Sequence, residues 1–373
     1  GFRPVRLHVT LPVDSALTIR LIPAPAVLPD LVTTAGRQVQ RAAETTAPVE
    51  TIDRRELEAT AAASVDRAVG DLSGVQQNGV RPAGTTLQIR GLGESRVLLL
   101  VDGEPVSGAL IENRDLSRTS TLAVDRIEVT RGPSSLEHGS DALGGVINVV
   151  TAAPEGPLQL STSGLAGGDG RREGSVGVHA GGPLAFRITG GVREFDRVAG
   201  QEAGGTTFER MWDLRSTLRT RLTSDWQLRA DANYERTRQR WPVTEARNGF
   251  VDTWTGGGFV EAGLSKPWGD LRLRVVGQRL DYRYREAIGL KPEGGADTLD
   301  QQERVLRGVV ALNRSLGPHR LAVGLEGGLR DVEAPQKIAG NAAGDQQLEG
   351  YAEDSWSAGR LLGYALAGAV GLY

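Results

Sequence analysis

The stretch from Arg96 to Thr151 decides the fold of this chain. It reads RVLLLVDGEPVSG over 96–108 and VDRIEVTRGPSSLEHGSDALGGVINVVT over 124–151. Its apolar and β-branched runs have the length of strands, and turn residues separate them. Asp102-Gly103 suits the left-handed positions of a tight hairpin turn. The predicted strands are Arg96–Val101, Arg126–Arg131 and Val146–Thr151, the second ended by Gly132-Pro133 and the third entered through Gly144-Gly145.

Residues just upstream predict a helix. Asp53 with Glu56 forms a capping box, and the helix is expected to run to about Asp71. Leu57, Ala61, Val65, Ala68 and Leu72 would form its apolar face. A strand over Thr85–Arg90 follows. Strands alternating with short helical segments predict a small α/β domain over residues 44–153.

From Gly156 onward the chain alternates apolar and polar residues with a period of two. Runs such as Trp226–Tyr234 and Leu321–Leu329 keep this alternation over most of their length, which is typical of long amphipathic strands. The run Leu271–Tyr284 changes phase near Val275-Val276, which predicts a β-bulge there. Short turns alternate with longer polar connections, a pattern typical of outer-membrane barrels. A soluble β-sandwich is the alternative, although its strands seldom exceed about ten residues.

We count about 11 strands in this region, whereas closed single-chain barrels of bacteria have an even strand number. The expected fold class is therefore mainly β: a small α/β domain followed by antiparallel transmembrane β-barrel strands. The odd count predicts that the sequence is a fragment. Tyr373 as a true C-terminal aromatic residue is the alternative.

Composition argues against several functional classes. The net charge is −3, whereas a nucleic-acid-binding protein usually has a basic excess, so no nucleic-acid partner is expected. There is no cysteine, which excludes disulfides and thiolate metal sites. The four histidines are dispersed and show no metal-ligand spacing, and no nucleophile elbow or phosphate loop occurs. No catalytic residue, metal or cofactor is predicted, and the protein is not expected to be an enzyme.

The motifs VLLLVDG, IEVTRGP and HGSDALGGVINVVT resemble, in this order and register, the plug domain of TonB-dependent outer-membrane receptors, especially the cobalamin and colicin I receptor branch. The resemblance implies that the small α/β domain is a plug and that the barrel has 22 strands, of which this sequence holds about 11. It also implies four segments. Residues 1–29 would be the end of a carboxypeptidase-regulatory-like β-sandwich and a linker, 30–43 the TonB box segment, 44–153 the plug, and 156–373 a partial transmembrane barrel. A monomer in the outer membrane of a Gram-negative bacterium, in contact with its lipid, is expected.

The resemblance also implies a partner and a set of site residues. The TonB box would be Leu31, Val32, Thr33, Thr34 and Ala35, an extended segment that pairs by strand addition with the periplasmic energy transducer TonB. Any linker can contain such a run. Plug loops that contact ligand would include Asn78, Arg81, Ser107, Asn113 and Arg114, with ordinary solvated loops as the alternative. Glu128 and Arg131 would dock the plug against the barrel or form a plain structural ion pair.

These features predict active, TonB-dependent uptake of a large scarce solute, such as a cobalamin, a siderophore or a haem-type metal chelate. The alternatives are a passive porin or adhesive barrel without energy coupling and, less favoured, a secreted β-rich enzyme. The identity of the ligand is not readable from the sequence, because specificity would reside mostly in loops.

Overall fold

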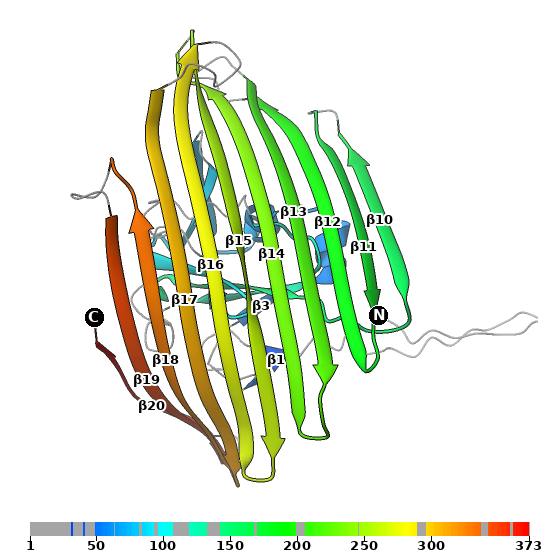
Figure 1. The fold of residues 1–373 in the computed structure, drawn as a ribbon, viewed down its shortest axis with the longest axis vertical. Coiled ribbons are helices and arrows are strands. Elements are labelled where there is room, and N and C mark those ends of the chain that lie inside the picture. The colour runs from blue at the N-terminus through cyan, green and yellow to red at the C-terminus, as the bar shows by residue number, and fades with distance from the viewer. Residues whose placement is uncertain are drawn as a thin grey trace, which may run out of the picture.

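The computed structural model describes most of the chain beyond residue 48. The described residues are 31–32, 40–41, 49–62, 64–81, 84–92, 96–106, 119–132, 142–167, 170–198, 206–244, 246–288, 296–336, 342–358 and 361–372. The predicted segment 1–29 lies outside them. Two bodies of structure follow one another in this sequence: a small mixed sheet with two helices and a large antiparallel sheet (Figure 1).

The small sheet has five strands in the order β3-β8-β9-β6-β7. β6 pairs in parallel with β9, and the other pairings are antiparallel. The core of this body packs side chains of β6, β8 and β9 against the helices, with Val65, Ile127 and Ile147 fully buried. The strands are β3 (Val49–Asp53), β6 (Val97–Val101), β7 (Glu104–Pro105), β8 (Val124–Arg131) and β9 (Gly145–Thr151). The three strands predicted from 96–151 are thus present.

The helical part differs from its prediction. Asp53 caps the first helix as predicted, because its carboxylate accepts a 2.9 Å hydrogen bond from the backbone N–H of Glu56. The continuous helix to Asp71 is wrong: α1 (Arg54–Ala59) ends after six residues and α2 (Val65–Val69) begins anew. Ala61, at φ +48°, takes the left-handed conformation that stops a helix. The break lets both Leu57 and Val65 reach the sheet core.

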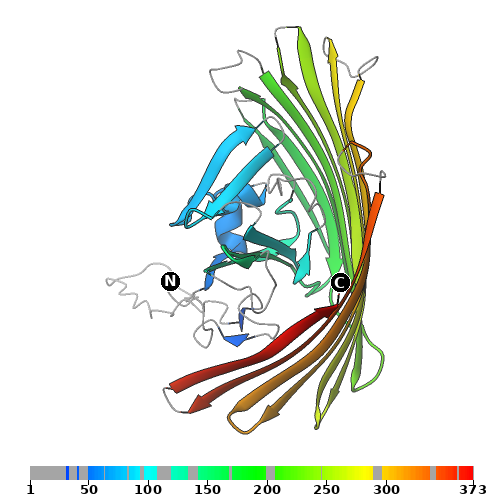
Figure 2. The same cartoon turned by 90° about the vertical axis from the view of Figure 1, so that its left-hand side faces the viewer.

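The turn between β6 and β7 has the predicted conformation. Asp102 and Gly103 both have positive φ angles, +51° and +80°, as a type I′ hairpin turn requires. A second hairpin, β4 (Val75–Arg81) with β5 (Gly84–Ile89), extends toward the end of the large sheet at which the longer connections lie (light blue in Figure 2).

The large sheet, here called the wall, has eleven antiparallel strands in sequence order, β10 to β20, which confirms the predicted strand number. Connections of two to four residues (181–183, 222–225, 267–268, 317–318, 359–360) alternate with connections of four to eight (167–171, 199–205, 243–246, 289–295, 334–341). The strands are β10 (Gln159–Ala166), β11 (Arg172–Ala180), β12 (Leu184–Val198), β13 (Thr206–Arg221), β14 (Trp226–Pro242), β15 (Arg247–Lys266), β16 (Gly269–Ile288), β17 (Ala296–Leu316), β18 (His319–Glu333), β19 (Ala342–Ala358) and β20 (Leu361–Leu372).

The wall is curved, and the small body lies on its concave side (Figure 2). The two faces of the wall differ in polarity, as the period-two pattern predicts. Leu218, Val260 and Val323 are exposed on the convex face, whereas Thr217, Glu303 and Arg274 on the concave face are buried. An apolar convex face and a polar concave face are the distribution found in membrane barrels with a filled lumen.

The β-bulge predicted at Val275-Val276 is wrong. β16 pairs with β15 without interruption there, and its one register shift against β17 lies between Tyr284 and Arg285. The apolar pattern changes phase because Val276, Leu280 and Tyr282 are buried on the concave face. None of the helices in the described ranges has the length and apolar character needed to cross a bilayer.

Candidate functional site: the interface between plug and wall

The β6–β7 turn carries two carboxylates to the concave face of the wall. Asp102 is fixed from behind by β9, since its two carboxylate oxygens accept hydrogen bonds from the Thr151 backbone N–H (3.0 Å) and hydroxyl (2.8 Å). The Gly103 N–H donates to the side-chain oxygen of Asn148 at 3.1 Å. The turn is therefore rigid before it meets the wall.

Asp102 pairs with an arginine of the wall. The Asp102 carboxylate lies 3.0 Å from the guanidinium of Arg229 on β14, and both side chains are largely buried. Arg229 also pairs with Asp231 at 2.5 Å and stacks over the ring of Phe259, with its central carbon 4.9 Å from the ring centre. These partners hold the guanidinium in place for Asp102.

Glu104 is the most heavily paired plug residue at the interface. Its carboxylate lies 2.6 Å from Arg274 on β16 and forms a second ion pair with Arg307 on β17. Each arginine keeps a wall carboxylate of its own, Glu261 at 2.5 Å from Arg274 and Glu326 at 2.8 Å from Arg307. Buried charges are tolerated when they are paired in this way, and removal of one partner is strongly destabilising.

Arg274 also donates to the Asp102 carbonyl at 3.1 Å, and three further wall arginines bind plug backbone carbonyls. Arg171 donates to the Ala61 carbonyl at 2.7 Å, Arg187 to that of Ala153 at 3.1 Å, and Arg215 to that of Ser120 at 3.4 Å. Gln278 on β16 similarly donates to the Pro105 carbonyl at 2.9 Å. The plug is thus attached to strands β12, β13, β14, β16 and β17 and to the β10–β11 connection.

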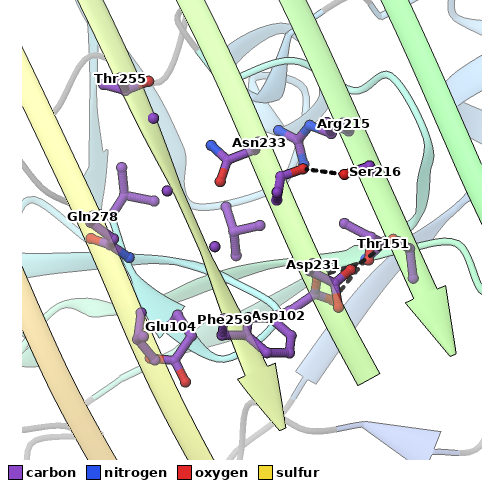
Figure 3. A pocket seen from close by; sticks show the side chains of 18 of the residues that line it. Asp102, Glu104, Thr151, Arg215, Ser216, Asp231, Asn233, Thr255, Phe259 and Gln278 are labelled. Atoms are coloured by element: carbon purple, nitrogen blue, oxygen red, sulfur yellow. Dashed lines mark hydrogen bonds between the residues drawn. The ribbon is translucent and has the colours of Figure 1, made fainter. Parts of the chain in front are cut away.

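Cavities lie between the described residues of the plug and the wall, and two of them bear on the site. One, of about 100 Å³, lies beside the anchored turn (Figure 3); Asp102 and Glu104 reach it from the plug, and Asp231, Asn233 and Gln278 from the wall. The other, of about 430 Å³, lies between α1 with residues 120–124 of the plug and strands β10 to β13 of the wall.

The predicted docking residues lie inside the plug sheet. Glu128 is fully buried and its carboxylate lies 2.8 Å from Arg126 on the same strand. Arg131 forms an ion pair with Glu50 on the neighbouring strand β3. These two ion pairs join plug residues to each other, and docking by Glu128 and Arg131 stays a prediction.

The other predicted site residues are only partly described. Leu31 and Val32 form a short strand, β1 (Leu31–Val32), which pairs with β2 (Gln40–Arg41); Thr33, Thr34 and Ala35 lie outside the described residues. Asn78 and Arg81 are backbone members of β4, paired with Thr86 and Gly84. Ser107, Asn113 and Arg114 lie outside the described residues.

Sequence reasoning missed the carboxylates that meet the wall. It treated Asp102 as a turn residue and gave Glu104 no role. The signal was available in part: two acidic residues flank a glycine at the end of an otherwise apolar run, and arginines recur at alternate positions of the later strands. Nothing in the sequence says which arginine meets which carboxylate.

Comparisons with known proteins agree with this architecture. Residues 41–146 match the family model of the TonB-dependent receptor plug domain. A vitamin B12 transporter BtuB from Vibrio cholerae is 41% identical over 125 residues, which are 33% of this chain and 20% of the relative. One from Photobacterium profundum is 29% identical over 167 residues, 43% of this chain and 28% of the relative. The alignments thus span a minor part of these relatives.

Solved structures share the fold across both bodies. The ferripyoverdine receptor of the outer membrane of Pseudomonas aeruginosa superposes with a TM-score of 0.70 at 13% identity, covering 87% of this chain and 52% of that one. The ferric enterobactin receptor PfeA of the same organism gives 0.63 at 20% identity, covering 83% of this chain and 55% of that one. The chain spans about half the length of these receptors.

A plug domain attached by buried ion pairs to the polar face of a strand wall, whose other face is apolar, defines a plugged membrane barrel as the class of protein. Residues 41–146 are a TonB-dependent receptor plug domain, and the chain shares the fold of outer-membrane receptors across this plug and the eleven wall strands that follow it. The relatives found are transporters and receptors.

Proposed function

We propose that the protein takes up a large scarce solute across the outer membrane by TonB-dependent active transport. The observation that carries the proposal is the plug itself, seated on the concave wall by Asp102 and Glu104. A plug that is ion-paired to its wall blocks passive flow, and therefore passage of a large solute requires an input of energy. The wall lies in the outer membrane with its apolar face toward lipid, and the protein catalyses no reaction.

The solute belongs to the group of cobalamins, siderophores and haem-type metal chelates. Support comes from the names of the relatives, which transport vitamin B12 or bind ferric enterobactin and ferripyoverdine. Plug residues Asn78, Arg81, Ser107, Asn113 and Arg114 are the ligand contacts of this proposal. TonB engages Leu31–Ala35 by strand addition, in which exposed backbone groups pair with an edge strand of the partner.

Energy coupling can be tested at Val32. Proline at this position removes a backbone N–H needed for strand pairing, whereas alanine keeps it. We expect Val32→Pro to abolish uptake of labelled cyanocobalamin or ferric enterobactin by cells that carry the full-length receptor as their sole route, and Val32→Ala to retain it. Binding of the same probe to the cell surface should be unchanged in both variants.

The rival functions predict other results. A passive porin or adhesive barrel would give the same uptake with Val32→Pro, and the same uptake in cells that lack TonB. A secreted enzyme would be recovered without detergent. Uptake that is unchanged in cells lacking TonB and unchanged by Val32→Pro would refute energy coupling.

A further inference from the structure

Among the described residues, the plug is attached differently to the two halves of the wall. Toward β14 to β17, the carboxylates of Asp102 and Glu104 are ion-paired with arginines of three strands. Toward β10 to β13, the hydrogen bonds that we identify run from guanidinium groups of Arg171, Arg187 and Arg215 to backbone carbonyls. A hydrogen bond from a guanidinium to a carbonyl is weaker than a buried ion pair, because breaking a buried ion pair leaves two buried charges without partners.

The larger cavity lies on the second side. Its volume is about 430 Å³, and small polar or glycine residues supply much of its wall lining. These residues are Ser161, Thr162, Ser163, Gly164, Gly174, Ser175, Thr189 and Gly191. Charged side chains of both signs, Glu58, Arg193 and Asp213, also line it. A lining of hydroxyl groups and of positively and negatively charged side chains suits a hydrophilic solute. Such a lining can replace the hydrogen bonds that the solute makes to water.

Arginines bridge plug and wall at opposite ends of the β11–β12 pair. Arg171 lies at the β10–β11 connection, next to the Arg172–Glu194 pairing, and binds Ala61 just beyond α1. Arg187 lies near the other end of this pair, opposite His179, and binds Ala153 after the last plug strand. Both of these hydrogen bonds can break without leaving their acceptor as an unpaired carboxylate, since the acceptors are backbone carbonyls.

We propose that this cavity is the closed form of the solute route. The route runs between the plug and strands β10 to β13, and Arg171 and Arg187 close it, while the β6–β7 turn stays anchored to β14–β17. Its cargo is a hydrophilic solute rich in hydroxyl, amide or carboxylate groups. The inference rests on the proposed function and adds where in the lumen the solute passes.

The test measures passive leakage through the full-length receptor in liposomes, with arabinose and raffinose as probes. Arg171→Ala combined with Arg187→Ala should raise the rate of arabinose-driven swelling by about a hundredfold, the change expected from loss of two charge-assisted hydrogen bonds at about tenfold each. Raffinose, which is larger, should enter more slowly. Gln278→Ala removes a plug-carbonyl contact on the anchored side and should leave swelling at the parent rate.

A second variant fixes the location of the leak. Because residues 1–373 contain no cysteine, Ala61→Cys with Arg171→Cys in the Arg187→Ala background places a single pair of thiols in this part of the receptor. This variant should leak until a bismaleimide links the two thiols, and linking should restore the parent rate. Heat-modifiable mobility in detergent checks that each variant is folded.

Equal leakage in the arginine variant and Gln278→Ala, leakage in neither, or leakage that persists after linking would each overturn the proposed route. The assay contains neither TonB nor a transported ligand. Its failure therefore leaves energy-coupled uptake standing, whereas failure of the Val32→Pro test leaves the leakage result unaffected.

Discussion

Replacing Glu104 by glutamine should loosen the plug from the wall by about 3 kcal/mol, because two charge-assisted contacts are lost from a buried site. Glutamine keeps the volume and one acceptor oxygen but removes the charge that Arg274 and Arg307 share. The cost stays near this value because each arginine retains its second carboxylate, Glu261 or Glu326. The measurement is the urea concentration at which trypsin begins to cut the plug of the detergent-solubilised receptor.

The matched control makes the same substitution at an exposed ion pair of the plug. Glu58 lies 2.8 Å from Arg54 one helical turn away, and both side chains are exposed. Such pairs contribute about 0–1 kcal/mol, so Glu58→Gln should leave the trypsin threshold nearly unchanged. Equal thresholds for Glu104→Gln and Glu58→Gln would show that Glu104 does not seat the plug.

Gly145→Ala should disrupt the plug sheet itself. Gly145 has a φ of +148°, and a Cβ there would lie 2.3 Å from the backbone carbonyl oxygen of Thr130 on β8. Because the obstacle is backbone, the strands β8 and β9 must separate, at a cost of about 3 kcal/mol or more. We expect the trypsin threshold of the plug to fall sharply and less receptor to reach the membrane.

Gly103→Ala separates the cost of backbone strain at a positive φ from the cost of steric overlap with a neighbouring strand. Gly103 also has a positive φ, +80°, but a Cβ there meets nothing within 4 Å. Only the conformational cost of about 1 kcal/mol is then expected. If Gly103→Ala and Gly145→Ala had the same effect, the close approach of Thr130 would not explain the glycine at 145.

Much of the fold was readable from local sequence because its causes are local. The Asp102-Gly103 turn, the glycines at the start of β9 and the alternating wall strands depend on neighbouring residues, and they were predicted correctly. The helix and the bulge were not. Ala61 breaks the helix although its neighbours favour one, and Val276 is apolar because of what covers the concave face, which no pattern along β16 reveals.

The sequence by itself determined that this protein has a plug followed by amphipathic strands. The residues that form a turn, or that alternate along a strand, lie within a few positions of one another, so the pattern can be recognised locally. Only the tertiary structure decided how the plug is held. Glu104 and Arg274 are 170 positions apart and meet within 2.6 Å. Many arginines lie on the wall strands, and the curvature and register of the sheet select those that face the plug. The site therefore arises from long-range geometry, while its parts arise from local chemistry.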